Sequence, residues 1–251
     1  MYDLAARYKQ TGSRAFCARK PGRPRLILHR RFVKKVVDLR KTTEYGSAKI
    51  HYVLAKTGFS VSRRQIQNIL DSEQLTVPCL KRRGKRTYVR FEWPISNYMW
   101  HTDWSKAGHK WYCAFLDDKS RKIMASGVFT NPTTQNTMFL LYQAILTHEV
   151  CPSVILSDKG AQFYANKHTK KGKRAISEFE HELADLGIEL WTSRRRHPQT
   201  NGKMEKWFDT MKQALPRFKN DLPTFVRWYN TERIHCSLDY KTPDEVYRDN
   251  V

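Results

Sequence analysis

Apolar residues in the N-terminal third of the chain recur every three to four positions, which predicts short helices. The predicted helices cover residues 29–39, 47–56 and 62–70. Ser62 stands where a side-chain N-cap is expected for the third helix, and a short turn containing glycine precedes it at 57–61. This part of the chain is therefore expected to form a small all-α unit.

The last two of these helices have the arrangement of a helix-turn-helix, in which a short turn leads to a helix that enters the DNA major groove. The second helix opens with basic and amide side chains, which can make paired hydrogen bonds to guanine or adenine. The candidate base contacts are Arg63, Arg64, Gln65 and Asn68. The alternative is a small helical bundle with a solvated basic face.

From residue 97 the pattern changes to short apolar runs bounded by turn residues, which is typical of strands. Runs at 98–104, 110–117 and 122–129 predict three antiparallel strands. The intervening Asp118-Lys119-Ser120-Arg121 has the composition of a tight turn, so the last two strands are expected to form a hairpin.

Helices and strands alternate after this hairpin. Helical spacing is found at 133–148, at 177–186 and from Met204 onward, and short apolar strands are predicted at 154–156 and 188–192. The predicted fold class is therefore α/β, with a mixed five-stranded sheet and flanking helices, preceded by the small all-α helix-turn-helix unit.

The charge of the chain is uneven. The 251 residues carry a formal net charge of +22, and residues 1–100 hold 23 Lys or Arg against 6 Asp or Glu. A basic first part followed by a nearly balanced second part indicates a polyanion-binding module attached to a domain with another task, although a charge excess kept for solubility is the alternative. The expected organisation is a basic arm at 1–28, the helix-turn-helix at 29–75, a basic linker at 76–96 and the α/β domain with C-terminal helices at 97–251.

The basic arm contains Gly22-Arg23-Pro24, which is expected to be extended because proline fixes φ. Arg23 in such a segment suits the DNA minor groove, where the negative potential is enhanced. An ordinary basic linker is an equally good interpretation.

The cysteines and the apolar runs limit the class of protein further. The five cysteines are far apart and form no CxxC pair, so we expect a reducing compartment and no disulfide framework. His101, His109 and Cys113 match no standard zinc spacing and are expected to be strand residues. The longest apolar run, at 138–142, is too short to cross a membrane, and no N-terminal signal pattern is found.

Three acids carry the candidate chemistry. Asp103 is expected at the end of the first strand, Asp158 at the end of the fourth, and Glu205 in the first turn of the helix after the fifth. Open α/β sheets place their sites at such strand ends, and three carboxylates that converge there need a cation, which suits Mg²⁺ or Mn²⁺. Each acid alone is unremarkable, because an aspartate after a strand is most often a turn or cap residue and Glu205 could simply complement its helix dipole.

The sequences around the three acids resemble the catalytic blocks of DDE transposases and retroviral-type integrases. The three blocks are His101-Thr102-Asp103-Trp104, Leu156-Ser157-Asp158-Lys159-Gly160-Ala161-Gln162-Phe163 and His197-Pro198-Gln199-Thr200-Asn201-Gly202-Lys203-Met204-Glu205. They look closest to bacterial and archaeal insertion-sequence transposases, and the tail at 228–245 is also similar to that group. The resemblance covers about residues 97–247 and implies an RNase H-like core.

The resemblance implies a transposase that cuts and joins DNA with Asp103, Asp158 and Glu205 as catalytic residues and ligands of Mg²⁺ (or Mn²⁺). It implies double-stranded DNA of element ends and target as partner, a homo-multimer on that DNA, no membrane partner, and a prokaryotic cytoplasmic location on the nucleoid. Two alternatives stay open: a non-catalytic or truncated transposase-derived DNA-binding protein, and an RNase H-like nuclease that cuts without joining.

Basic residues surround the third acid and are expected to hold DNA phosphates, with a solvated surface as the alternative. They are Arg194, Arg195, Arg196, Lys203 and Lys206. The chain departs from the family in one spacing, because 46 residues stand between Asp158 and Glu205, more than is usual. A basic surface insertion at 167–174 is the expected cause, since a longer surface loop costs little stability.

Overall fold

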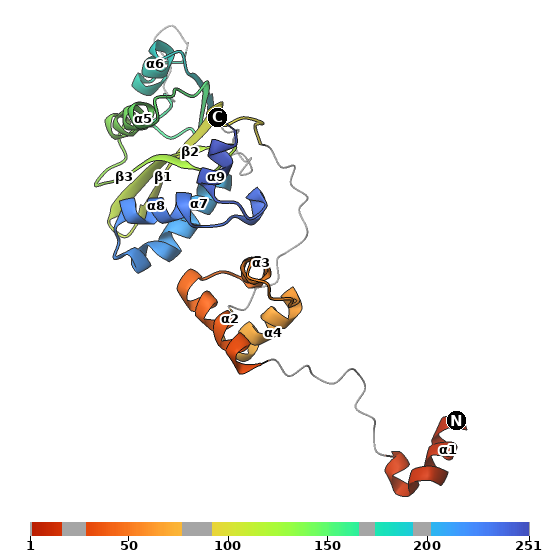
Figure 1. Cartoon of the computed structure of the whole chain (residues 1–251). Coiled ribbons are helices and arrows are strands. Elements are labelled where there is room, and N and C mark those ends of the chain that lie inside the picture. Colours follow the sequence, from red (N-terminus) through yellow and green to blue (C-terminus); the bar gives the residue numbers. More distant parts are fainter. Residues whose placement is uncertain (1, 17–28, 77–91, 166–173, 193–201, 251) are drawn as a thin grey trace. The chain divides into compact units, whose positions relative to one another are not determined.

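The computed structural model describes residues 2–16, 29–76, 92–165, 174–192 and 202–250. The chain divides into two compact units, Met1–Pro78 and Cys79–Val251, and each is described by itself. Figure 1 shows the helices of the first unit and the sheet with its flanking helices in the second.

The first unit contains the three helices predicted from the apolar spacing. They are α2 (Arg30–Thr43), α3 (Ser47–Lys56) and α4 (Arg63–Ser72). Val36, Ile50 and Ile66 contribute one fully buried side chain from each helix, so the three apolar stripes meet in a common core. Removing these side chains from water is the main favourable term for so small a unit.

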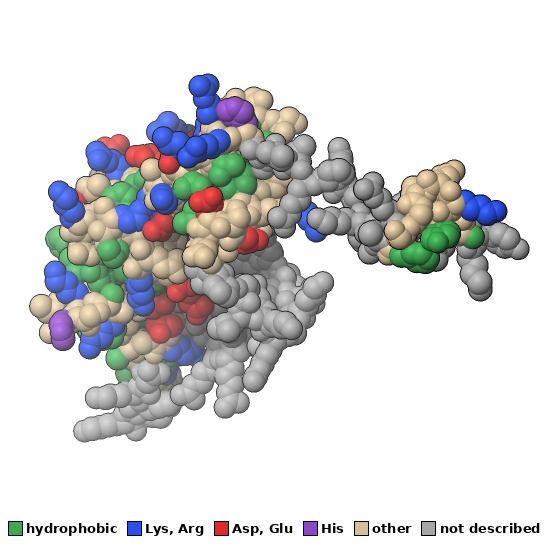
Figure 2. Space-filling view, turned by 90° about the horizontal axis from the view of Figure 1, so that it is seen from below, with side chains coloured by type: hydrophobic (Ala, Val, Ile, Leu, Met, Phe, Trp, Pro, Cys, Tyr) green, Lys and Arg blue, Asp and Glu red, His purple; other side chains and the backbone are tan. Residues whose placement is uncertain are grey.

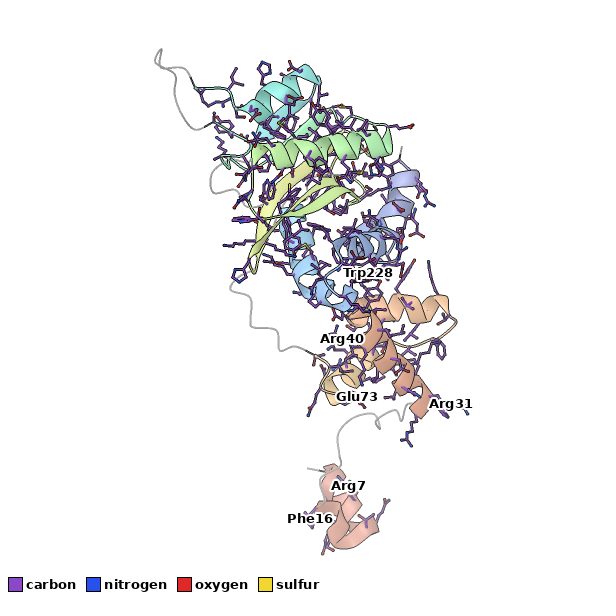
Figure 3. All side chains as sticks on the ribbon, turned by 90° about the vertical axis from the view of Figure 1, so that its left-hand side faces the viewer. Arg7, Phe16, Arg31, Arg40, Glu73 and Trp228 are labelled. Carbon is purple, nitrogen blue, oxygen red and sulfur yellow. The ribbon has the colours of Figure 1, made fainter. Side chains whose placement is uncertain are left out.

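Polar contacts fix the ends of these helices. The Ser62 side chain accepts the backbone N–H of Gln65, and the Gln65 side chain accepts that of Ser62 at 2.9 Å, which confirms the predicted N-cap as a full capping box. Arg40 of α2, labelled in Figure 3, donates to the carbonyl oxygens of Tyr45 and Leu75 at 3.2 Å each. The end of α2 is thereby tied to the segment that follows α4.

The first residues of the chain form two elements that the apolar pattern did not predict. They are α1 (Tyr2–Thr11) and the 3₁₀ helix η1 (Gly12–Phe16), joined by a contact between the rings of Tyr8 and Phe16 with centroids 5.5 Å apart. A pair of alanines in α1 favours helix. The Gly22-Arg23-Pro24 segment, expected to be extended, lies outside the described residues.

The second unit is built on one mixed sheet with the predicted number of strands among the described residues. The strands are β1 (Met99–Ala107), β2 (Lys110–Asp117), β3 (Ile123–Phe129), β4 (Val154–Ser157) and β5 (Glu189–Thr192). Their spatial order is β3-β2-β1-β4-β5. The pairs β1–β2 and β2–β3 are antiparallel, as predicted, and β1–β4 and β4–β5 are parallel.

Helices cover both faces of this sheet (Figure 1). The helices are α5 (Thr134–His148), α6 (Glu178–Asp185), α7 (Gly202–Ala214), α8 (Leu222–Thr231) and α9 (Pro243–Arg248), with short 3₁₀ turns η2 (Leu215–Phe218) and η3 (Cys236–Leu238). Among the described residues, no helix is both long and apolar enough to span a membrane.

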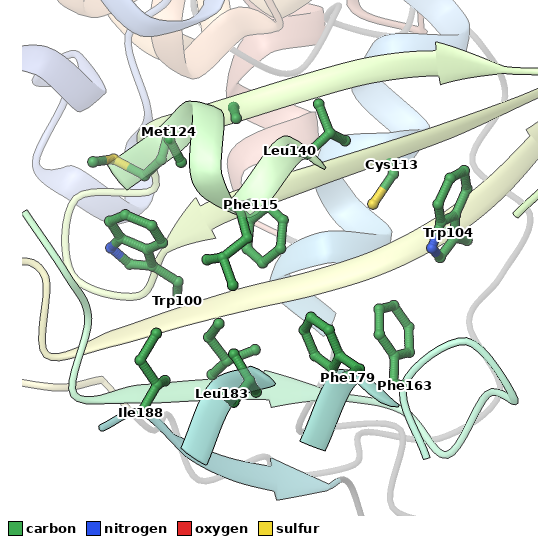
Figure 4. Close-up of a cluster of buried hydrophobic side chains, with 14 residues drawn as sticks. Trp100, Trp104, Cys113, Phe115, Met124, Leu140, Phe163, Phe179, Leu183 and Ile188 are labelled. Carbon is green, nitrogen blue, oxygen red and sulfur yellow. The ribbon is translucent and has the colours of Figure 1, made fainter. Parts of the chain in front are cut away.

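Side chains alternate between the two faces along the strands, as a pleated sheet requires. Trp100, Trp104 and Phe115 pack with buried residues of α5 and α6 in the cluster that Figure 4 shows. Ala114 and Leu116 point to the other face and pack with Met204, Trp207, Phe208 and Met211 of α7. The face that α7 covers is therefore the face of the even-numbered residues in this part of β2.

The structure corrects the predicted end of the first strand. β1 does not stop near Asp103 but continues to Ala107, because its antiparallel ladder with β2 runs on to the pair Ala107 and Lys110. Gly108, with φ of +60°, then supports the two-residue turn into β2. Asp103 therefore lies within a strand and not after it.

Candidate active site

Asp103 lies in β1, and Asp158 directly follows the neighbouring parallel strand β4. The parallel pairing of β1 with β4 ends at His101 and Leu156. Asp103 follows His101 by two residues, and Asp158 follows Leu156 by two residues. The same end of the parallel ladder therefore carries both aspartates, although β1 itself continues.

The side chain of Asp103 belongs to the face that α7 covers. Asp103 pairs directly with Ala114 of β2, and cross-strand partners project to the same side of a sheet. Ala114 packs in the cluster that contains Met204 and Trp207 of α7. The half-buried Asp103 is thus directed toward the layer of the helix that carries Glu205.

Asp158 lies in a turn that is closed by its own side chain. Its Oδ1 accepts the backbone N–H of Gly160 at 2.8 Å, and its carbonyl oxygen accepts the hydroxyl of Ser157 at 2.9 Å. A Cβ atom on residue 160 would lie 2.9 Å from Asp158 Oδ1 and 2.5 Å from Gln162 Nε2. A larger residue here would therefore force the Gln162 side chain and the Asp158 carboxylate to shift.

Glu205 lies in the first turn of α7, as predicted, and its side chain is exposed. The neighbouring Met204 and Trp207 are buried at 0% and 1% exposure, so they fix which side of the helix faces the sheet. The remaining side presents Glu205 to solvent. This side-chain pattern is that of an amphipathic helix.

The three acids are not gathered into a ready metal site. Within the described residues, which include all three, no group of three or more His, Cys, Asp or Glu side chains is placed to hold a metal ion. Like-charged carboxylates repel one another when no cation lies between them. The structure thus places Asp103 and Asp158 at the same end of the β1–β4 ladder and Glu205 on helix α7. The convergence of all three carboxylates stays a prediction.

The donor chemistry of these residues fits a hard divalent cation. Carboxylate oxygens are the ligands that Mg²⁺ and Mn²⁺ prefer, and few other ligand types are needed because such ions keep several waters. The bond from Gly160 orients the Asp158 carboxylate. The two aspartates and Glu205 are therefore the residues that could hold such an ion.

A buried polar cluster beside this edge was not predicted as a unit. Asp118, expected only to be a turn residue, has a side chain that is 1% exposed. Its Oδ1 lies 2.5 Å from His101 Nε2 and also receives the ammonium group of Lys203, and its Oδ2 accepts the backbone N–H of Trp93 at 2.8 Å. Sequence alone offers no signal for this cluster, because its members are far apart along the chain.

Burial and the hydrogen bonds inside this cluster shift the pKa values of its members. Burial alone would raise the pKa of Asp118, but the hydrogen bonds from His101 and Lys203 and the charge of Lys203 hold that pKa below its usual range. Burial lowers the pKa of His101, although the hydrogen bond and charge of Asp118 oppose this shift. The buried Nδ1 of His101 has no hydrogen-bond partner among the described residues. Burial and the nearby charge of Arg121 lower the pKa of Lys203 to about 8, although Asp118 opposes this shift.

The side chain of Asp117 accepts hydrogen bonds from the segment before β1 and from the hairpin turn. Its Oδ1 accepts the backbone N–H of Asn97 at 2.7 Å, and its Oδ2 accepts both the backbone N–H and the hydroxyl of Ser120 at 2.8 and 2.6 Å. Burial raises the pKa of Asp117, although these bonds oppose the shift. Asp117 therefore orders the hairpin turn, as expected.

The predicted DNA contacts differ in how available their side chains are. Arg63, Arg64 and Asn68 are exposed on α4, whereas the Gln65 side chain is engaged in the capping box. On α7, Lys206 is exposed, but Lys203 is turned inward to Asp118. Arg23, Arg194, Arg195 and Arg196 lie outside the described residues. On the face in Figure 2, basic and acidic side chains are interspersed.

Comparison with known families gives matches over the second unit. A family model described as "Integrase core domain" matches residues 94–198, and a second model with the same description matches residues 186–243. The two matched segments together include Asp103, Asp158 and Glu205.

Relatives of the chain include proteins of mobile elements. A putative integrase of Spiroplasma virus SpV1-C74 is 27% identical over 143 residues, which are 51% of this chain and 39% of that protein. The transposase for insertion sequence element IS904 of Lactococcus lactis is 22% identical over 235 residues, which are 82% of this chain and 88% of that protein. The chain thus spans about two fifths of the first relative and most of the second.

The fold is similar to that of solved retroviral proteins. A chain of the simian T-cell lymphotropic virus intasome, solved in complex with PP2A regulatory subunit B56 gamma, superposes with a TM-score of 0.52 at 20% identity. The superposition covers 84% of this chain and 74% of that chain. This likeness establishes the fold, which is the RNase H-like mixed sheet with flanking helices.

Proposed function

The chain belongs to the integrase core domain family of DDE transposases and integrases, and we propose from this premise that it is an insertion-sequence transposase. It cleaves double-stranded DNA at element ends and transfers the cut strand to target DNA, as a polynucleotidyl transferase. The observation that carries the proposal is the position of Asp103 and Asp158 at the same end of two parallel strands, inside the region that the family models match.

Asp103, Asp158 and Glu205 act as the ligands of divalent cations in this proposal. Mg²⁺ or Mn²⁺ bound there supplies activation of a water or a 3′-hydroxyl and neutralises charge on the phosphodiester. The chain's own residues prepare the site. Gly160 fixes one oxygen of Asp158, β1 directs Asp103 toward the α7 layer, and the buried face of α7 leaves Glu205 on its open side.

DNA binding is divided between the two units. The exposed Arg63, Arg64 and Asn68 of α4 read base edges at the element end, and the exposed Lys206 beside Glu205 contacts a phosphate. A strongly basic chain, with a net charge of +22, favours such a polyanionic partner. Joining two ends requires more than one copy, so the active form is a homo-multimer on DNA.

The proposal is tested by nicking and joining of DNA in the presence of Mn²⁺ or Mg²⁺. Wild type is compared with Glu205→Gln, and with Asp209→Asn as the matched control, because Asp209 is an exposed acid one turn further along α7. We expect metal-dependent joining in wild type and the control, and its loss in Glu205→Gln.

Three results would contradict the proposal or its assignment of Glu205. Nicking without joining in wild type would identify a nuclease. Tight DNA binding by a folded wild-type protein that neither nicks nor joins would identify a non-catalytic DNA-binding protein. Equal activity of Glu205→Gln and wild type would remove Glu205 from the site.

A further inference from the structure

One buried carboxylate connects three segments that are far apart in the sequence. Asp118 stands in the turn after β2, and its Oδ1 meets His101 of β1 at 2.5 Å and the ammonium of Lys203 of α7. The carbonyl oxygen of Asp118 accepts the same ammonium at 3.2 Å, and its backbone N–H donates to the carbonyl of Met99 at 2.9 Å. Side chain and backbone of one residue thus hold both β1 and α7.

The two elements held by Asp118 carry two of the acids described above. His101 precedes Asp103 by two residues and belongs to the same face of β1. Lys203 precedes Glu205 by two residues in the first turn of α7. Asp118 therefore links Asp103 to Glu205 through two polar contacts, one to His101 and one to Lys203. Each of these two residues is only two positions from one of the acids.

The first turn of α7 has two fixed points among the described residues. Met204 is fully buried in the apolar cluster, which holds the helix at its depth. Lys203 reaches Asp118 with a side chain that is only 17% exposed, which limits rotation and sliding of the same turn. Packing alone tolerates small shifts of a helix end, whereas a charge-assisted hydrogen bond specifies direction and length.

We propose that Asp118 is a positioning residue, which through His101 and Lys203 sets the separation between the Asp103 and Glu205 carboxylates. This inference rests on the proposed function, in which these two acids bind the same metal ions. Asp118 does not itself touch metal or DNA. Its effect is to hold the first turn of α7, which carries Glu205, in a fixed position relative to β1.

The test separates the placing of Glu205 from the stability of the unit. Lys203→Met removes the ammonium but keeps an unbranched apolar stem, and it leaves the Asp118 carboxylate buried with one fewer partner. The double variant Asp118→Asn/Lys203→Met removes both charges, so no buried charge lacks its partner. Lys241→Met is the matched control, because Lys241 pairs with Asp249 at 2.7 Å on the surface, where both side chains are more than half exposed.

Two quantities are measured on the full chain of each variant. One is the dissociation constant of Mn²⁺, determined by calorimetric titration of the metal-free protein. The other is the urea concentration at half unfolding. We expect Lys203→Met to weaken Mn²⁺ binding about tenfold or more and to lower the midpoint, as for residues that orient metal ligands. The double variant should regain most of the midpoint but keep the weak Mn²⁺ binding, and Lys241→Met should match wild type in both.

Recovery of Mn²⁺ affinity together with stability in the double variant would overturn the proposal, since the cluster would then be only structural. The proposal would also fail if folded Lys203→Met bound Mn²⁺ like wild type while Glu205→Gln bound it weakly, and the proposed function would survive that result. If Glu205→Gln itself bound Mn²⁺ like wild type, the proposed metal role of Glu205 would fail, and the positioning role would fail with it.

Discussion

Asn230 offers the sharpest test of how the C-terminal helices are attached to the sheet. β3 is an edge strand, and its residue Ile123 directs its backbone N–H and carbonyl away from β2. The N–H donates to Asn230 Oδ1 at 3.0 Å, and Asn230 Nδ2 donates to the carbonyl at 2.9 Å. One side-chain amide of α8 therefore takes the place of a neighbouring strand and covers the edge.

The cost of losing this amide follows from its burial. Asn230 and Ile123 are 8% and 2% exposed, so water has little access to the two backbone groups. A buried donor or acceptor left without a partner costs about 1–3 kcal/mol. Asn230→Ala leaves the N–H and the carbonyl of Ile123 without their partner. We therefore expect a loss of about 3 kcal/mol in the free energy of unfolding. For a unit of this size that is a fall of roughly 6–12 °C in Tm.

The assay is urea unfolding followed by circular dichroism, with Asn136→Ala as the control. Asn136 also lies on a helix of the same unit, but its amide makes a single exposed bond to the carbonyl of Asn131 at 3.1 Å. The control should lose no more than about 0.5 kcal/mol. If Asn230→Ala lost less than about 1 kcal/mol, the reasoning about unsatisfied edge groups would be refuted.

Two further predictions concern the site and its pH dependence. Gly160→Ala should reduce DNA joining about tenfold or more, because the new Cβ displaces Asp158 Oδ1 and small misplacements of reacting groups are costly. Gly46→Ala is the control, because a Cβ there meets nothing within 4 Å. Equal joining by both variants would contradict this prediction. Burial lowers the pKa of His101 and of His148 from 6.5, so the unfolded chain binds more protons below that pH. The free energy of unfolding should therefore be retained above about pH 6.5 and fall as the pH drops below it, and His148→Gln should flatten part of this fall in urea unfolding between about pH 7.5 and pH 5. An unchanged slope in His148→Gln would show that His148 takes no part.

The elements that could be predicted from sequence are those specified by neighbouring residues. Ser62 and Gln65 stand three positions apart, so one pattern predicts the N-cap and the start of α4, and the structure confirms it. The turn at Asp118 to Arg121 between two apolar runs was predicted for the same reason. The apolar runs on either side of this turn then predicted the antiparallel part of the sheet correctly.

The features that could not be predicted depend on residues far apart in the chain. Asp118 has the composition of a turn residue, and its role depends on His101 and Lys203, which are 17 and 85 residues away. Lys203 was expected to contact DNA phosphate because a lysine near a run of arginines usually lies on the surface. The continuation of β1 beyond Asp103 depends on its pairing with β2. It was not predicted, because the residues after Asp103 include polar ones and do not form an apolar run.

The three acids of the site were predicted from three short sequence blocks. The fold alone does not bring all three carboxylates together among the described residues. The parallel register brings Asp103 and Asp158 to one edge. Glu205 is near the start of α7, which covers the sheet face to which Asp103 belongs. Residues 193–201, which precede α7, lie outside the described part of the chain. A cation shared by the three carboxylates would offset their mutual repulsion.

The most direct test of this account is a crystal structure of the full chain with Mn²⁺, in which anomalous scattering locates the metal. We expect a manganese peak within about 2.2 Å of a carboxylate oxygen from each of Asp103, Asp158 and Glu205, or two peaks that share these ligands. Manganese bound elsewhere, or bound at this edge without Glu205, would contradict the central claim that these three acids form one metal site.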